Sequence, residues 1–440
     1  MTVPGRIDYF YQTLLPAISM GLLTLALSLA KTGRDALFFQ GRGLFRFPMA
    51  YMLVGLVSLL GAALYVRAMK IWGARACRTG SMIFAAIVLA ILVPALRPGN
   101  YPALMSLFIF IPTVFGILFA SIWLLASDLF AGAPKRIAAR SFSRIGASAL
   151  AGGMAGGLLA KGFVPFLDPE WLVLLAAVII VIAAGVVVQT HVKFPAAAIV
   201  AQGPELGQPI NITTAFSKNY ARGLLLIAMA AALAGILIDF LFYAAASSAR
   251  MDARGNANFF ANYYSMLYFS SLVVQLLVAP KIQDKLGLLS GLIILPLALL
   301  GGATFVTAVS TALSRSALKV TEGGLKASIH RSIWEQAFIP VETKERSFVK
   351  MFVDGIGARA AESIGAIMLF VWLMQVDVTD PSGLDVKWIV WFLMVVIGVW
   401  LFFTRDLRRR ARRSIELGEI ACARFPDQCP CTTEWGKGIA

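Results

Sequence analysis

Long apolar stretches follow one another along the whole chain, and this feature restricts the possible folds more than any other. A helix crosses the hydrocarbon core of a bilayer with about 20 mainly apolar residues. Stretches that approach or exceed this length cover residues 10–30, 47–66, 80–96, 102–126, 145–167, 171–190, 220–246, 258–279, 288–313, 317–341, 347–375 and 387–404. We therefore predict an all-α polytopic membrane protein with twelve transmembrane helices.

The composition agrees with this prediction and excludes other classes. Of the 440 residues, 59% are hydrophobic and 14% are charged, whereas soluble proteins carry about 25% charged residues. A soluble enzyme and a disordered protein are thereby excluded. Four cysteines, three of them in the last twenty residues, are too few and too scattered for a secreted disulfide scaffold, and their spacing matches no zinc site. We expect no metal site and no cofactor.

The basic residues indicate how the helices are oriented. The net charge is +16, and basic side chains gather in alternate connections between the apolar stretches. Under the positive-inside rule these connections are cytoplasmic. We therefore expect both termini in the cytoplasm, and no nucleic-acid partner. The residues are Arg67, Lys70, Arg75, Arg78, Lys135, Arg136, Arg140, Arg144, Lys281, Lys285, Lys344, Arg346 and the run 405–413.

The chain divides into two related halves. Residues 191–218 form the longest polar connection, and three short patterns recur at an offset of 211 residues: Ser-Ile-Trp, Lys-Ile and Ile-Gly-Ala. Two parallel six-helix halves are typical of major facilitator transporters. We predict a six-helix bundle over 1–190, a cytoplasmic linker over 191–218, a second bundle over 219–404 and a basic cytoplasmic tail over 405–440.

Ionisable residues occur inside the apolar stretches. Each costs about 2.5–3.5 kcal/mol at the centre of a membrane helix, so they should pair with one another or line an aqueous cavity. In 317–341, four such residues follow helical spacing on one stripe, and a neighbouring pair lies four residues apart. They are Lys319, Glu322, Lys326 and His330, with the pair Arg331 and Glu335. The alternative is an amphipathic surface helix that does not cross, but it would invert the charge pattern of later loops.

Further charges lie in other stretches. Lys350 and Asp354 are spaced as an i,i+4 pair and Arg359 and Glu362 as an i,i+3 pair, while Asp239 stands alone. The alternative for Asp239 is a carboxylate satisfied by one neighbouring helix. We predict a substrate-binding set of Lys31, Arg34, Asp35, Lys319, Lys326, Arg331, Trp334 and Arg359, and a coupling or gating set of Asp128, Asp239, Glu322, Glu335, Asp354 and Glu362.

Two further patterns bear on function. The run Gly152-Gly153-Met154-Ala155-Gly156-Gly157 contains overlapping GxxxG patterns, which favour close helix packing. No phosphate-binding G-x-x-x-x-G-K-[ST] loop is present, and no nucleophile with a base and an acid is suggested by spacing. We therefore expect no enzyme.

Four segments resemble the ATP/ADP translocases, the nucleotide transport proteins of obligate intracellular bacteria and plastids within the major facilitator superfamily. They are LAKTGRDALFF (29–39), SIWLLASDLF (121–130), GILIDFLFYAAA (235–246) and the polar run 325–366. The resemblance implies exchange of nucleotides without hydrolysis, and with it we expect the helices to lie in the cytoplasmic (inner) membrane of a bacterium. It also implies that the matching charges bind phosphate or gate exchange: Arg34, Asp35, Asp128, Asp239, Lys326 and Glu335.

The chain departs from that family at two positions. Trp334 and Glu362 stand where the translocases usually carry lysines, and Lys319, Arg331 and Arg359 are the cations that would compensate. We expect an alternating-access secondary transporter, monomeric in the lipid bilayer, for an anionic small molecule such as a nucleotide or another phosphorylated solute. The alternative is a proton-coupled carrier or exporter of a non-nucleotide amphipathic solute or lipid. A lipid-handling or regulatory membrane protein is a third reading, since the basic tail can bind anionic headgroups.

Overall fold

The computed structural model describes residues 6–40, 43–97, 99–130, 135–194, 219–249, 251–278, 291–338, 341, 349–376 and 384–424. All regular secondary structure in these residues is helical, as predicted. The chain forms two compact units. The first consists of Met1–Leu206, Ala246–Phe269 and Asp377–Ser382, and the second of Gly207–Ala245, Ser270–Val376 and Gly383–Ala440. Because this clustering groups 246–269 with the first unit, the predicted bundle boundaries remain a prediction.

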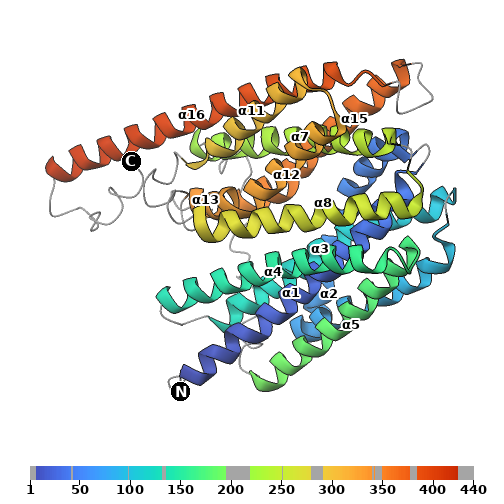
Figure 1. Ribbon diagram of the computed structural model, residues 1–440. Coiled ribbons are helices and arrows are strands. Elements are labelled where there is room, and N and C mark those ends of the chain that lie inside the picture. Colours follow the sequence, from blue (N-terminus) through green and yellow to red (C-terminus); the bar gives the residue numbers. More distant parts are fainter. Residues whose placement is uncertain are drawn as a thin grey trace. The chain divides into compact units, whose positions relative to one another are not determined.

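The first unit is built around α1, which packs against three of its neighbours, α3, α4 and α5. The helix α2 packs against α3 and α5. Proline in the first turn helps to start α3 and α5, because its missing N–H is not needed there. Figure 1 shows these helices from blue to green: α1 (Arg6–Phe38), α2 (Gly43–Leu92), η1 (Val93–Ala95), α3 (Tyr101–Leu129), α4 (Lys135–Phe163) and α5 (Pro169–Lys193).

The second and third predicted stretches are joined without the loop that the sequence indicated. The helix α2 runs through 67–79 and departs from helical geometry at Gly73, whose φ is 79° and ψ is 157°. Glycine adopts positive φ without the steric penalty that a Cβ brings. The predicted loop is therefore wrong, and its place is taken by a kink at one residue.

The second unit contains the helices that carry most of the predicted site. Its helix α12 begins with a reciprocal cap in which Thr311 and Ser314 exchange hydrogen bonds. The helices in chain order are α7 (Asn219–Ser248), α8 (Ala253–Val273, most of it in the first unit), η3 (Val274–Val278), α11 (Ile294–Ala308), α12 (Ala312–Leu325), η4 (Lys326–His330), α13 (Arg331–Ala337), η5 (Phe352–Gly357), α15 (Ala358–Gln375) and α16 (Lys387–Arg424).

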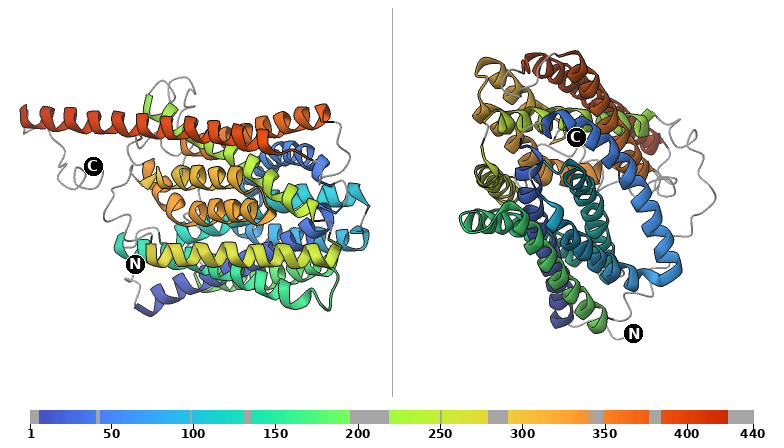
Figure 2. Two further views of the ribbon diagram at one scale, coloured as in Figure 1. Left: turned by 45° about the horizontal axis from the view of Figure 1, so that its top comes forward. Right: turned by 90° about the vertical axis from the view of Figure 1, so that its right-hand side faces the viewer.

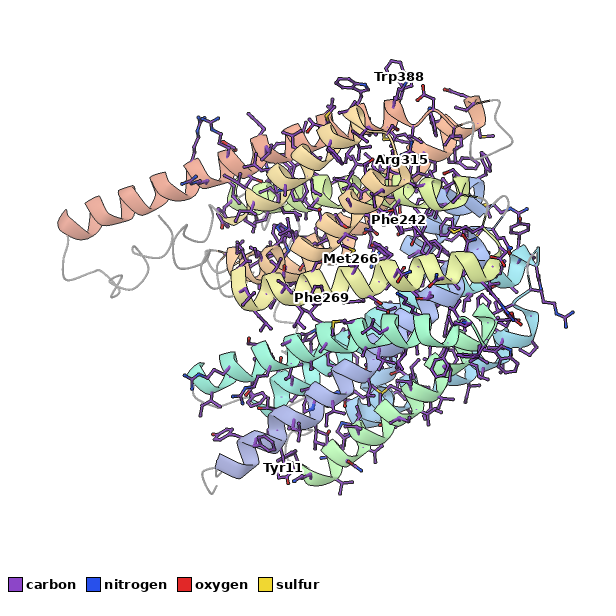
Figure 3. The ribbon with its side chains drawn as sticks, viewed as in Figure 1. Tyr11, Phe242, Met266, Phe269, Arg315 and Trp388 are labelled. Atoms are coloured by element: carbon purple, nitrogen blue, oxygen red, sulfur yellow. The ribbon has the colours of Figure 1, made fainter. Side chains whose placement is uncertain are left out.

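The described helices account for all twelve predicted stretches when α2 is counted as two helices, and when η3, η4–α13 and η5 are joined to their neighbours. Seven described helices are long and apolar enough to cross a membrane on these grounds alone. The others are shorter or carry more polar residues, and α11 is an apolar helix of 15 residues. Large apolar side chains such as Trp388, Met266 and Phe269 are exposed, which suits a lipid environment (Figure 3).

The glycine run of α4 packs on two sides. A Cβ on Gly156 would lie 2.5 Å from the carbonyl oxygen of Leu25 on α1, and one on Gly157 would lie 2.5 Å from the hydroxyl of Ser265 on α8. Gly152 faces α1 and Gly153 faces α8 in the same way. The packing interpretation of the GxxxG patterns is confirmed.

The last helix, α16, is longer than the predicted final stretch. It spans 38 residues and continues past residue 404 into the basic tail, as the left view of Figure 2 shows. The tail therefore starts as a continuation of the twelfth helix. The cysteines Cys429 and Cys431 lie outside the described residues.

Candidate functional site

The end of α1 forms a buried polar cluster in the first unit. Nη2 of Arg34 lies 2.6 Å from Oδ1 of Asp35, and both side chains are buried. The hydroxyl of Tyr264 on α8 donates to Oδ2 of Asp35 at 2.6 Å. The guanidinium of Arg34 lies 4.2 Å from the ring centre of Phe108, and Nζ of Lys31 lies 5.7 Å from that of Tyr264. The three predicted charges thus lie together, with two aromatic rings that were not in the predicted set.

Asp128 pairs with a residue that the sequence assigned to a loop. Nη2 of Arg78 lies 2.5 Å from Oδ2 of Asp128, with 0% of the arginine side chain and 8% of the aspartate side chain exposed. Arg78 was predicted to lie in a loop, and this is wrong because α2 continues through it and packs on α3. Its contribution to orientation stays a prediction. The sequence signal that could have pointed to Arg78 was Asp128, an acid at the end of an apolar stretch for which no partner was predicted.

Lys319 of α12 stands between two acids in the second unit. Its Nζ lies 2.6 Å from Oδ1 of Asp239 on α7 and 2.6 Å from Oε2 of Glu322. Lys326 lies 3.0 Å from the other oxygen of Glu322. The predicted stripe is therefore an ion-pair network, and Asp239 is satisfied by a neighbouring helix, as the alternative for it proposed.

A π-turn, η4, follows directly after this network. The N–H of Arg331 donates to the carbonyl of Lys326, five residues earlier. Residues five apart in a regular α-helix point about 140° from each other, whereas the extra residue of a π-turn reduces this angle to about 40°. Lys326 and Arg331 therefore share a face. Their side chains are 50% and 62% exposed, more than any other predicted substrate-binding cation.

The same π-turn removes His330 from the predicted stripe. A regular helix would place His330 on the face of Lys326, but the side chain is buried and its ring packs edge-on against Trp400 of α16. Its Nδ1 has no hydrogen-bond partner among the residues that the structure describes. Trp334 stacks on His330 with ring centres 5.9 Å apart and an angle of 18°.

The charges of α13 pair partly as predicted. Nη2 of Arg331 lies 2.7 Å from Oε1 of Glu335, which confirms the predicted i,i+4 pair. Lys350 pairs with the other oxygen of Glu335 rather than with Asp354. The predicted pair of Lys350 and Asp354 is wrong because the π-turn η5 begins between them and breaks the i,i+4 geometry.

Trp334 lies inside the second unit rather than on an open surface. Its ring is buried and also contacts Phe338, and its Nε1 donates to Oδ1 of Asp354 at 2.8 Å. Further along the chain, Arg359 and Glu362 form the predicted i,i+3 pair at 2.7 Å. The second unit therefore contains the partly exposed cations Lys326, Arg331 and Arg359, together with the more buried ion pairs of Lys319.

No group of three or more His, Cys, Asp or Glu side chains among the described residues is arranged to hold a metal ion. The chemistry available at the cluster is charge-assisted hydrogen bonding. Ammonium and guanidinium donors are well suited to carboxylate and phosphate oxygens, which are acceptors only.

No family model matches this chain, and no curated protein sequence matches it. Solved structures do. A mutant of the nucleoside transporter NupG is 15% identical with a TM-score of 0.64, and the match covers 90% of this chain and 99% of that one. The xylose transporter XylE from E. coli is 12% identical with a TM-score of 0.59, covering 90% and 97%. The POT family transporter PepTSo is 11% identical with a TM-score of 0.60, covering 91% and 98%.

These matches extend over nearly the whole of each chain, and at these identities they identify the fold alone. The protein is an all-α, multi-pass membrane protein with the major facilitator fold. The predicted fold class is therefore confirmed.

Proposed function

We propose that the protein is an alternating-access secondary transporter, similar to the ATP/ADP translocases, that carries an anionic solute across a bacterial cytoplasmic membrane. The observation that carries this proposal is the pair Lys326 and Arg331, two exposed cations that the π-turn brings to one face of a helix in the second unit. The solute class is a nucleotide or another phosphorylated compound. The resemblance of residues 325–366 to the translocases supports it.

The donors of these two cations support anion binding. Lys326 has three N–H donors and Arg331 has five. Within the described residues, Lys326 pairs with Glu322 and Arg331 with Glu335, which leaves further donors on both side chains. An anion with several oxygens would use them, and such charge-assisted hydrogen bonds are roughly twice as strong as neutral ones.

The remaining predicted residues would have supporting roles. Lys31, Arg34 and Asp35 form a cluster in the first unit and Lys319 belongs to a network in the second, and each group would shape the electrostatic field of its own unit. Arg359 is 35% exposed and would add a third contact. The acids Asp239, Glu322 and Glu335 would take these cations back when the solute leaves, because each already lies within ion-pair distance of one.

Counterflow in proteoliposomes tests the proposal. Purified protein preloaded with unlabelled ADP should accumulate radiolabelled ADP or ATP, or another anion from a panel that includes inorganic phosphate. Lys326→Ala should reduce the initial rate at least about tenfold, a loss of one charge-assisted contact, while Lys326→Arg should retain part of it.

A matched control is Lys161→Ala, which removes an exposed lysine near the end of α4. It should transport like wild type. Undiminished counterflow in a folded Lys326→Ala protein would refute the assignment of the site, and thermal stability that no anion changes would count against an anionic solute altogether.

A second candidate is a proton-coupled carrier or exporter of a non-nucleotide amphipathic solute. The observation in its favour is that Trp334 and Glu362 replace two lysines of the translocases, with Trp334 buried and Glu362 already paired with Arg359. Stabilisation of the purified protein by amphipathic compounds, together with no response to nucleotides, would favour this candidate.

A further inference from the structure

Among the predicted acids that the structure describes, Asp354 differs from the others in its partner. Each of the other predicted coupling acids, and Asp35, lies within ion-pair distance of a cation. For Asp354, the described residues supply no cation nitrogen within 4.0 Å. Its partner is the uncharged indole N–H of Trp334, at 2.8 Å.

The charges around Asp354 come from two helices. The charges of Arg331 and Glu335 on α13 interact electrostatically with the carboxylate of Asp354. So does the charge of Lys350, which lies on the same helix as Asp354. Both cations are already paired with Glu335. On the α7 side, the contact next to η5 is between Gly357 and the apolar Leu225. Asp354 is therefore near two cations that another acid holds.

This pairing makes Asp354 the acid that is easiest to neutralise. Protonating an acid that is paired with a cation leaves that cation without its counter-charge, which is costly in a low-dielectric environment. Protonating Asp354 weakens one hydrogen bond from an uncharged donor. Asp354 therefore differs from the six paired acids, because its protonation leaves no cation without its ion-pair partner.

Protonation of Asp354 changes the summed charge of the spans in the second unit. Apart from Arg222 and Lys387 at the ends of their stretches and Arg315 in the first turn of α12, the spans of this unit contain five cations and five acids, so these ten charges sum to zero. When Asp354 is protonated, the sum becomes +1. One negative charge on a bound solute would restore the balance. The ten residues are Lys319, Lys326, Arg331, Lys350 and Arg359, with Asp239, Glu322, Glu335, Asp354 and Glu362.

We infer that Asp354 is the proton-binding residue that couples an anionic solute to a proton, and that Trp334 is its positioning residue. This inference rests on the proposed function, because it assumes that the solute is an anion. In the step, the carboxylate of Asp354 takes one proton from water on the side of solute entry and becomes a carboxylic acid. The acid returns the proton to water on the opposite side as the solute leaves, and no other bond changes.

The proton site is tested without any solute, by infrared difference spectroscopy of the purified protein during a pH titration. Wild type should gain the carbonyl band of a protonated carboxylic acid as the pH is lowered. Asp354→Asn should lose that band, whereas Glu362→Gln, which removes a paired acid from the same stretch of chain, should keep it. A band that persists in Asp354→Asn would overturn the inference.

Two more variants allow the inference to be tested even if Asp354→Asn does not fold. Asp354→Glu should keep a titrating band at a changed frequency, because the carboxyl group is one methylene further from the backbone. Trp334→Phe should change the midpoint of the wild-type band, since the indole donor is gone. A band with unchanged frequency and midpoint in both variants would also overturn the inference.

The coupling is tested with inorganic phosphate and ADP as probes. In wild type the affinity for a bound anion should rise as pH falls, by up to about tenfold per pH unit, the limit for one linked proton. In Asp354→Asn the affinity should not depend on pH across the same range. Anion binding with an unaltered pH dependence in this variant would refute coupling while leaving the proposed function intact. If Asp354 titrates but neither inorganic phosphate nor ADP binds to the protein at any pH tested, the proposed function and, with it, the coupling are refuted, while the proton site stands.

Discussion

Ion pairs in the first unit differ in burial, and burial decides what each contributes to stability. The pair of Arg78 and Asp128 is enclosed by protein, whereas Arg254 and Asp168 lie 3.0 Å apart with about half of each side chain exposed. Removing one partner of a buried pair leaves an uncompensated charge and costs about 3–5 kcal/mol. An exposed pair contributes about 0–1 kcal/mol.

We therefore predict that Arg78→Ala lowers the midpoint of thermal unfolding of the detergent-purified protein strongly. Arg254→Ala, the matched control from the exposed pair, should leave the midpoint nearly unchanged. The double variant Arg78→Met, Asp128→Leu should recover much of the loss, because neither charge is then left alone. Equal effects of the two single variants would contradict the buried pairing.

At the scale of helices, two properties determine where the charged residues lie: how closely neighbouring helices approach each other, and the rotational register of the residues along each helix. Gly157 allows α4 to approach α8 so closely that a Cβ there would lie 2.6 Å from the backbone nitrogen of Ser265. At Gly162, in the same helix, such a Cβ would have no heavy atom of the described residues within 4 Å. The two glycines therefore differ in packing while sharing one helix.

Alanine at these two positions should have opposite effects on thermal stability. Gly157→Ala should lower the unfolding midpoint because the backbone of α8 must move away. Gly162→Ala should leave it unchanged or raise it, since alanine is better in a helix than glycine by about 1 kcal/mol. A Gly157→Ala protein as stable as wild type would show that α4 and α8 are further apart.

The π-turn η4 has a different consequence for register. It contains one residue more than an α-helical turn, so deletion of Ala327 should convert it to a regular turn with Lys326 and Arg331 at i,i+4 and the following helix still in register. Deletion of Val320 in α12 should rotate Lys319 by about 100° away from Glu322 and Asp239.

Deletion of Ala327 should therefore give a folded protein that retains anion binding, whereas deletion of Val320 should lower the unfolding midpoint and the yield. Size-exclusion profiles and thermal unfolding of the two purified variants provide the measurement. The register argument fails if the Ala327 deletion is the more damaging of the two.

At the scale of the whole molecule, the apolar helices and the major facilitator fold define a multi-pass membrane protein. The proposed orientation places both termini in the cytoplasm, because basic residues occupy alternate connections and the end of the chain. The cysteines of the tail and the buried Cys77 allow this orientation to be examined with the native chain.

A membrane-impermeant maleimide should label the protein in inside-out vesicles and leave it unlabelled in intact cells. Peptide mapping should locate the label on Cys422, Cys429 or Cys431. Cys77 should react only after denaturation, because its side chain is buried. Labelling of the tail in intact cells would reverse the orientation.

Much of the fold could be predicted from the sequence because hydrophobic length is a local property. The same holds for ion pairs within one helix: Lys319 with Glu322, Arg331 with Glu335 and Arg359 with Glu362 follow from i,i+3 and i,i+4 spacing. The run of glycines likewise indicated close packing before any neighbour was known. These features depend on residues within a few turns of each other.

The remaining features required the tertiary structure, since they join residues from different helices or depend on irregular backbone. Asp239 and Asp128 each pair with a cation from another helix. Asp35 likewise accepts a hydrogen bond from the hydroxyl of Tyr264 on another helix. The kink at Gly73 and the two π-turns change which residues share a face, and no periodicity in the sequence marks them. The sequence by itself thus determined how many helices there are and which of them carry charge. Only helix packing decided which charges on different helices neutralise one another, and it left Asp354 with an uncharged donor.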